Sequence, residues 1–112
     1  MATTVEVCVG MYGMEGICGG DMGAAIGAIK LAEECGIDQV SVTDHVVMGS
    51  NTDKYPYGEF PSPPEAPWYE PHTVLSAIAG ATQHIKLSAG VIISPLRSAV
   101  LFAKQMATLD VI

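Results

Sequence analysis

The sequence is poor in basic residues. Its 112 residues include five Lys and Arg against twelve Asp and Glu, which gives a formal net charge of −7. The basic residues are scattered, so we predict no nucleic-acid partner and no anionic membrane surface. No apolar run approaches the roughly 18 residues of a membrane span, and the N-terminal segment lacks the basic flank and apolar stretch of a signal peptide. We therefore expect one cytoplasmic domain.

Cysteine is also scarce. Cys8, Cys18 and Cys35 are odd in number and show no C-x-x-C spacing. This pattern excludes a disulfide framework and predicts reduced thiols. Cys18 lies in a Gly-rich segment where a catalytic thiol is conceivable, but an inert thiol is the simpler interpretation.

Motifs for metal binding and for serine hydrolysis are missing. The candidate ligands have neither H-x-H nor H-E-x-x-H spacing, and no G-x-S-x-G elbow occurs. These candidates are Asp44, His45, His72 and His84. We therefore predict no metal site.

The sequence does contain a regular alternation of strand and helix patterns. Strands are expected at 5–9, 39–43 and 85–93, and helices at 21–35, 71–82 and 98–109. This βαβαβα order predicts an α/β fold with parallel strands and right-handed crossovers. In such folds ligands bind at the carboxyl ends of the strands. The inward-facing residues of the last helix are expected to be Val100, Leu101, Ala103 and Ala107.

Two segments match neither pattern. Residues 10–20 have glycine at every third position but no phosphate-binding motif, so we predict a mobile loop. Residues 46–70 hold five of the seven prolines and five of the seven aromatic residues. A loop this long is typically a lid or binding loop, and its aromatic content argues against a disordered insertion. We expect Tyr57 and Trp68 of this loop to face a substrate.

Four polar or small residues lie just after the expected strands or, in the case of Gly90, within one. Asp44 and His45 directly follow the second strand, and they form either an active-site pair or a turn cap beside an exposed histidine. Arg97 follows the third strand and either meets an anion or is solvated. Gly90 marks either a close backbone approach by a ligand or a site where crowding in a barrel is relieved.

Three segments follow one another along the chain: AEECGIDQVSVTDHVV with its VTDH motif, the Pro67-Trp68 pair and AKQMATLDV. In this order they resemble the luciferase-like monooxygenase superfamily and, within it, the coenzyme F420-dependent oxidoreductases. The resemblance implies a TIM (β/α)8 barrel. Residues 1–112 would form its N-terminal three βα units, a truncated single domain, because an entire barrel takes about 250 residues. We expect such a fragment to be inactive alone and to associate, since its strand edges and barrel-facing apolar side chains would lack partners.

The resemblance also implies a function. The protein would transfer hydride between coenzyme F420 and an unknown organic small-molecule substrate. It would act as a homo-oligomer such as a dimer. The alternatives are an FMN-dependent monooxygenase of the same superfamily and a non-catalytic flavin- or F420-binding protein.

The resemblance further assigns site residues. It places Asp44 and His45 near the deazaflavin ring and the substrate. It assigns Gly90, Val91 and Ile92 to cofactor binding and implies a cis peptide bond between Gly90 and Val91. We expect His45 to move the proton that accompanies hydride transfer, because imidazole titrates near neutral pH.

Overall fold

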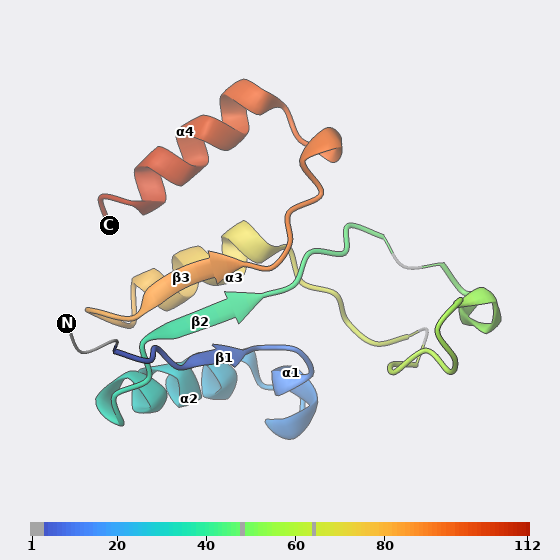
Figure 1. Cartoon of the computed structure of the whole chain (residues 1–112), viewed down its shortest axis with the longest axis horizontal. Coiled ribbons are helices and arrows are strands. Elements are labelled where there is room, and N and C mark those ends of the chain that lie inside the picture. Colours follow the sequence, from blue (N-terminus) through green and yellow to red (C-terminus); the bar gives the residue numbers. More distant parts are fainter. Residues whose placement is uncertain (1–3, 48, 64) are drawn as a thin grey trace.

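Three parallel strands form the centre of the molecule. The computed structural model describes residues 4–47, 49–63 and 65–112. The strands are β1 (Cys8–Gly10), β2 (Gln39–Val42) and β3 (Lys86–Ala89), and they lie in the order β1-β2-β3 with both pairs parallel (Figure 1). This arrangement confirms the predicted α/β class and parallel sheet. Three strands do not close a barrel.

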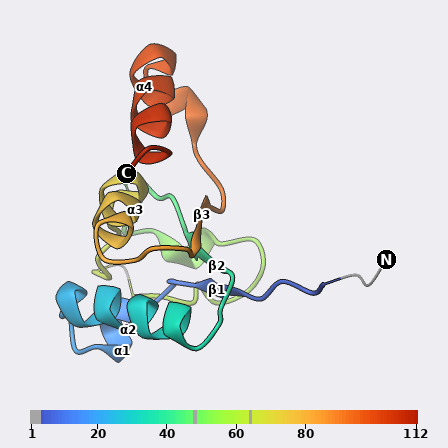
Figure 2. The same ribbon diagram turned by 90° about the vertical axis from the view of Figure 1, so that its left-hand side faces the viewer.

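Helices α2 (Met22–Glu34) and α3 (Pro71–Ala79) contact each other and pack against one face of the sheet (Figure 2). Side chains alternate across a strand, so Val40 and Val42 point toward these helices. The core consists of Met11, Ala25, Ile29, Val40, Val42, Val74, Leu75, Ile78 and Ile85. The core therefore lies between these two helices and one face of the sheet.

The other face of the sheet is built from small or polar residues. The pairing register places Gln39 of β2 beside Cys8 and Lys86, and Ser41 beside Gly10 and Ser88. The expectation of apolar side chains on this face is therefore wrong for the three strands. The apolar side chains of the strands point toward the helices instead.

The segment expected to be a mobile loop contains a short helix, α1 (Met14–Ile17). Gly13 begins it with a positive φ of 72°, a conformation that glycine adopts readily. Met11 is buried, and Met14 and Cys18 pack against the core. These three residues follow helical spacing, and the regular glycine pattern between them obscured that signal.

Helix α4 (Ala99–Leu109) forms where a helix is expected, but none of its side chains is buried. Val100 is 83% exposed, and Leu101, Ala103 and Ala107 are exposed as well. The prediction that these four residues face inward is wrong. The helix stands away from the sheet (Figure 1) and contacts α3, while an open groove of about 690 Å³ separates it from β3.

The connections that follow β2 and β3 lie at the carboxyl ends of these strands. β3 ends at Ala89 instead of residue 93, and its continuation includes the short 3-10 helix η2 (Ser94–Leu96). Loop 46–70 extends beyond the end of β2 and contains a second 3-10 turn, η1 (Thr52–Lys54) (Figure 1). None of the helices in the described ranges has the length and apolar character that a membrane span requires.

Candidate active site

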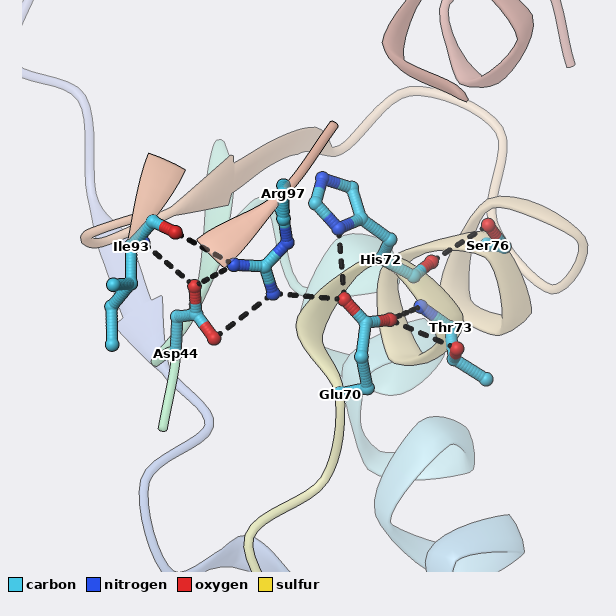
Figure 3. Close-up of polar contacts among 7 residues, drawn as sticks. All are labelled: Asp44, Glu70, His72, Thr73, Ser76, Ile93 and Arg97. Carbon is cyan, nitrogen blue, oxygen red and sulfur yellow. Dashed lines mark hydrogen bonds and ion pairs between the residues drawn. The ribbon is translucent and has the colours of Figure 1, made fainter. Parts of the chain in front are cut away.

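The carboxylate of Asp44 is buried at the carboxyl end of β2 and is engaged by two donors. The Asp44 side chain has 0% exposure. Arg97 donates from Nη1 to Oδ2 at 2.5 Å and from Nη2 to Oδ1 at 3.0 Å, and the Ile93 amide donates to Oδ2 at 2.7 Å (Figure 3). Both carboxylate oxygens are therefore fixed, and the loops that follow β2 and β3 are joined.

Arg97 also binds a second carboxylate. Its Nη2 donates to Glu70 Oε1 at 3.1 Å, and its Nη1 donates to the Ile93 carbonyl at 3.3 Å. The Arg97 side chain is only 12% exposed. Of the two alternatives left open by the sequence, Arg97 therefore meets anions, and these are two carboxylates of its own chain.

Glu70 is the N-cap of α3 and the centre of a second group of contacts. Its Oε2 accepts from the Thr73 amide at 2.8 Å and from Thr73 Oγ1 at 2.9 Å. Its Oε1 lies 2.9 Å from Nδ1 of the buried His72. Among the described residues, His72 Nε2 has no hydrogen-bond partner, and the ring packs edge-on against Phe102 of α4 at 5.0 Å.

These contacts keep the network ionised. Burial alone would raise the pKa of Asp44, but the hydrogen bonds from Arg97 and the Ile93 amide outweigh it and lower that pKa. Burial likewise opposes ionisation of Glu70, yet the hydrogen bonds from His72, Thr73 and Arg97 lower its pKa to about 2. The hydrogen bond to Asp44 raises the pKa of Arg97. At neutral pH one cation therefore lies between two carboxylates.

His45 does not share the environment of Asp44. Successive residues of an extended segment point in opposite directions, and His45 is half-buried against Trp68. The two ring centroids lie 4.1 Å apart with an interplanar angle of 63°. Trp68 also packs against Tyr12 at 5.8 Å and Phe60 at 6.3 Å. The structure therefore brings His45 and Trp68 together.

Tyr57 is placed differently. It is 85% exposed and contacts Tyr55, which in turn contacts Phe60. Within the described ranges, ring contacts through Tyr55 and Phe60 link Tyr57 to Trp68. A hydrogen bond between Tyr12 and Ser62 links the loop to the segment after β1.

The cavity beside this aromatic group is small. It has a volume of about 40 Å³ and is lined by residues that include Met11, Thr43 and Trp68. Such a volume suits a water molecule, whereas pockets for drug-sized ligands measure about 300–1,000 Å³. A large planar ligand would therefore contact the open surface of these loops.

Residues 90–92 present backbone at the same edge of the sheet. The Gly90 amide donates to the Val42 carbonyl at 2.9 Å, which places this segment beside the residues that lead to His45. The Gly90–Val91 peptide bond is cis, as predicted, and Val91 is 75% exposed. A Cβ atom at Gly90 would lie 2.8 Å from Ser41 Oγ. Gly90 thus allows close approach of the chain to β2.

The other predicted chemistry-bearing residues lie elsewhere. In the part of the chain that the structure describes, no group of three or more His, Cys, Asp or Glu side chains is placed to hold a metal ion. His84 precedes β3, so it lies at the opposite end of the sheet from His45. Cys8, Cys18 and Cys35 are free cysteines in this structure.

The fold and this site define an α/β protein whose polar residues gather at the carboxyl ends of parallel strands. Residues 6–112 match the model of the luciferase-like monooxygenase family, and the chain belongs to that family. No curated protein and no solved structure matches the chain. Family membership indicates an oxidoreductase, and members of the family use flavin or F420 cofactors.

Sequence reasoning missed Glu70, and it considered His72 only as a candidate metal ligand. Glu70 directly precedes α3, and His72 lies in the first turn of this helix. The E-P-H-T order contains the signal for Glu70, because Pro71 is suited to a first helical position and an acidic side chain before it can cap the helix. No local pattern indicates that Glu70 also reaches Arg97, which lies 27 positions away in sequence.

Proposed function

We propose that this protein is an F420-dependent oxidoreductase that transfers hydride between the deazaflavin and a small organic substrate. Family membership over residues 6–112 supports the oxidoreductase class. The parallel order β1-β2-β3 supports a TIM barrel in which residues 1–112 form the first three βα units. The resemblance of the VTDH motif and its neighbours supports F420 as the cofactor.

The observation that supports the proposal is an exposed backbone segment, residues 90–92, beside the strand that leads to His45. Val91 is exposed, and Gly90 hydrogen-bonds to the end of the strand that leads to His45. Gly90, Val91 and Ile92 fit the face of a planar ring, and they would hold it there. Coenzyme F420, when bound, accepts or donates the hydride. Arg97 is engaged by two carboxylates, so an anionic cofactor tail would need basic groups other than this side chain.

His45 moves the proton in this proposal. Transfer of hydride to or from an alcohol or an activated double bond leaves one proton to be released or supplied, and imidazole does this near neutral pH. Asp44 does not exchange that proton, because both of its oxygens are hydrogen-bonded and burial excludes solvent. Trp68 covers one side of His45 and limits the access of water. Tyr57, on the same loop, contacts the substrate.

The second candidate is an FMN-dependent monooxygenase, which the description of the family favours. Absorbance titration of the full-length natural protein with F420 and with FMN separates the two. Binding of F420 with turnover of reduced or oxidised F420 supports the proposal. Binding of FMN with oxygen consumption supports the second candidate. Binding without turnover over a broad set of alcohols and enones would indicate a cofactor-binding protein, and absence of binding to either cofactor would contradict the proposal.

A further inference from the structure

Loop 46–70 is held at both of its ends by one side chain. Asp44 and His45 precede the loop, and Trp68 and Glu70 lie at its far end. Arg97 comes from a different loop, after β3, and binds Asp44 and Glu70 at the same time (Figure 3). We refer to Asp44, Arg97 and Glu70 as the Arg97 bridge.

We infer that Arg97 is a positioning residue that closes the base of loop 46–70 and thereby holds His45 against Trp68. Asp44 is the residue before His45, so its position fixes the backbone from which the imidazole projects. Glu70 follows Trp68 by two residues and fixes the other partner of the ring contact. The inference rests on the proposed function in one respect, namely that His45 is the group that moves the proton.

The two ends of the bridge differ in environment. Asp44 has 0% side-chain exposure, and it meets both terminal nitrogens of Arg97, an arrangement that the planar fork of arginine permits and lysine does not. Glu70 is 46% exposed and meets a single nitrogen. Water competes for exposed ion pairs, so the Glu70 end is the weaker one. The far end of the loop is therefore the end that opens when the bridge is weakened.

Arg97 has little capacity left for an external anion. Its two terminal nitrogens make four hydrogen bonds, to Asp44 twice, to Glu70 and to the Ile93 carbonyl. These bonds use the N–H groups that face the site, and the side chain is almost enclosed. Arg97 therefore acts through Asp44 and Glu70 and does not itself bind substrate.

The ring contact provides a direct measurement. A protonated imidazole quenches the emission of an indole ring that it touches, so Trp68 emission, recorded from about pH 8 to about pH 5, should fall as the pH is lowered. Trp68→Phe identifies the emission of this indole in the full-length natural protein. His45→Asn identifies the part of the quenching that belongs to His45, because His72 of the neighbouring network is also an imidazole. Asp44 and Glu70 have lowered pKa values and remain ionised over most of this range.

Two variants weaken the bridge at opposite ends. Glu70→Ser keeps a good N-cap for α3, since serine accepts from the helix amide, but serine is too short to reach Arg97. Arg97→Lys keeps the positive charge and removes the fork. Each is expected to lose most of the His45-dependent quenching while its far-UV circular dichroism stays that of the parent protein. Glu59→Ser is the matched control, because Glu59 is on the same loop and forms no hydrogen bond or ion pair with Arg97 within the described ranges.

Full quenching in either folded variant overturns the inference, as does an equal loss in Glu59→Ser. If Arg97→Lys does not fold, the quenching measured for Glu70→Ser tests the inference by itself. Titration with F420 and FMN is carried out on the same samples. Loss of quenching in a protein that binds neither cofactor contradicts the proposed function and leaves the positioning role standing, so the two failures are distinguishable.

Discussion

Asp44 and His45 are neighbours in the chain with opposite environments. Asp44 points into the protein and is neutralised by Arg97, whereas His45 is half-buried against an aromatic ring. A buried carboxylate with every oxygen hydrogen-bonded holds structure, while an imidazole at the edge of a strand is free to exchange protons. In the proposed function, the two residues that stand out in the sequence therefore have separate roles.

Replacing His45 by alanine should slow the chemical step. General acid–base help is typically worth about 10²–10⁴-fold in rate, so kcat should fall at least about tenfold. The cofactor should still bind, because its contacts are assigned to residues 90–92. Steady-state kinetics and a cofactor titration of full-length His45→Ala measure the two quantities. An unchanged kcat would show that His45 is only a residue at a strand end.

Removing the Asp44 carboxylate should destabilise the fold. Breaking a buried ion pair by deleting one partner typically costs about 3–5 kcal/mol, and Asp44→Ala also removes the acceptor for the Ile93 amide. Arg97 keeps its contact with the partly exposed Glu70 when Asp44 is removed, so we expect a loss at the lower end of that range. Urea unfolding measures it, with Asp53→Ala as the control for an exposed aspartate of the same loop. Equal unfolding free energies for the two variants would contradict this assignment.

The same network should make stability depend on acid pH. The pKa of Glu70 is lowered from 4.5 to about 2 in the folded protein, and that of Asp44 is also lowered. A depressed carboxyl pKa stabilises the folded state above the unfolded-state pKa, and this contribution is lost as pH falls through the folded-state pKa. The unfolding free energy should therefore decline between about pH 5 and pH 2. Urea titrations across this range measure it, and Glu70→Ser should show a shallower decline than the parent protein.

The order of elements could be predicted because the signals are local. The stripe of Val74, Leu75 and Ile78 is buried on α3, and the alternation in β2 buries Val40 and Val42. Periodicity shows which residues share a face, and this information is sufficient to predict α2, α3 and the parallel sheet.

The parts that could not be predicted depend on distant partners. Periodicity shows that α4 has an apolar face, but whether that face is covered depends on segments elsewhere, and Val100 is exposed. Likewise, no sequence pattern joins Arg97 to Glu70 and Asp44, whose separation in the chain is 27 and 53 residues. His45 and Asp44 could be found because a strand end is a local feature.

Glu33 connects two elements at the end of the sheet opposite the site. Its carboxylate accepts from the Gln83 amide at 2.9 Å, the His84 amide at 2.5 Å and the Ile85 amide at 2.8 Å, just before β3 begins. The hydrogen bond from His84 is the main cause that lowers the pKa of Glu33, against a smaller opposing effect of burial. A carboxylate shared by three amides ties the end of α2 to the start of β3.

Glu33→Gln should therefore lower stability without changing the chemistry. A neutral amide accepts weaker hydrogen bonds and presents one acceptor oxygen instead of two. The difference from the parent protein should shrink at low pH, because protonation of Glu33 removes the same interaction. Thermal unfolding at neutral and acid pH measures the effect, with the exposed neighbour Glu34→Gln as the control. A parallel loss of kcat would indicate that Glu33 also affects the site.

At the scale of the whole molecule, the two faces of the sheet are unequal. The helical face holds the core, whereas the opposite face carries small or polar residues such as Ser41 and Ser88. In this three-stranded sheet β1 and β3 are edge strands, and α4 has no buried side chain. Apolar exposure is therefore concentrated on α4 and the loops, while unpaired backbone groups lie along the two strand edges.

A polypeptide of residues 1–112 should therefore associate in solution. Unpaired strand edges are templates for pairing with another chain, and exposed side chains such as Val100 and Leu101 add apolar surface to be covered. The net charge of −7 opposes this association, and salt screens that repulsion. Light scattering should show oligomers whose size increases with ionic strength. Replacing Val100 and Leu101 by lysine separates the two routes: smaller species would indicate association through α4, and unchanged species association through the strand edges. A monomer that unfolds cooperatively at every salt concentration would contradict both.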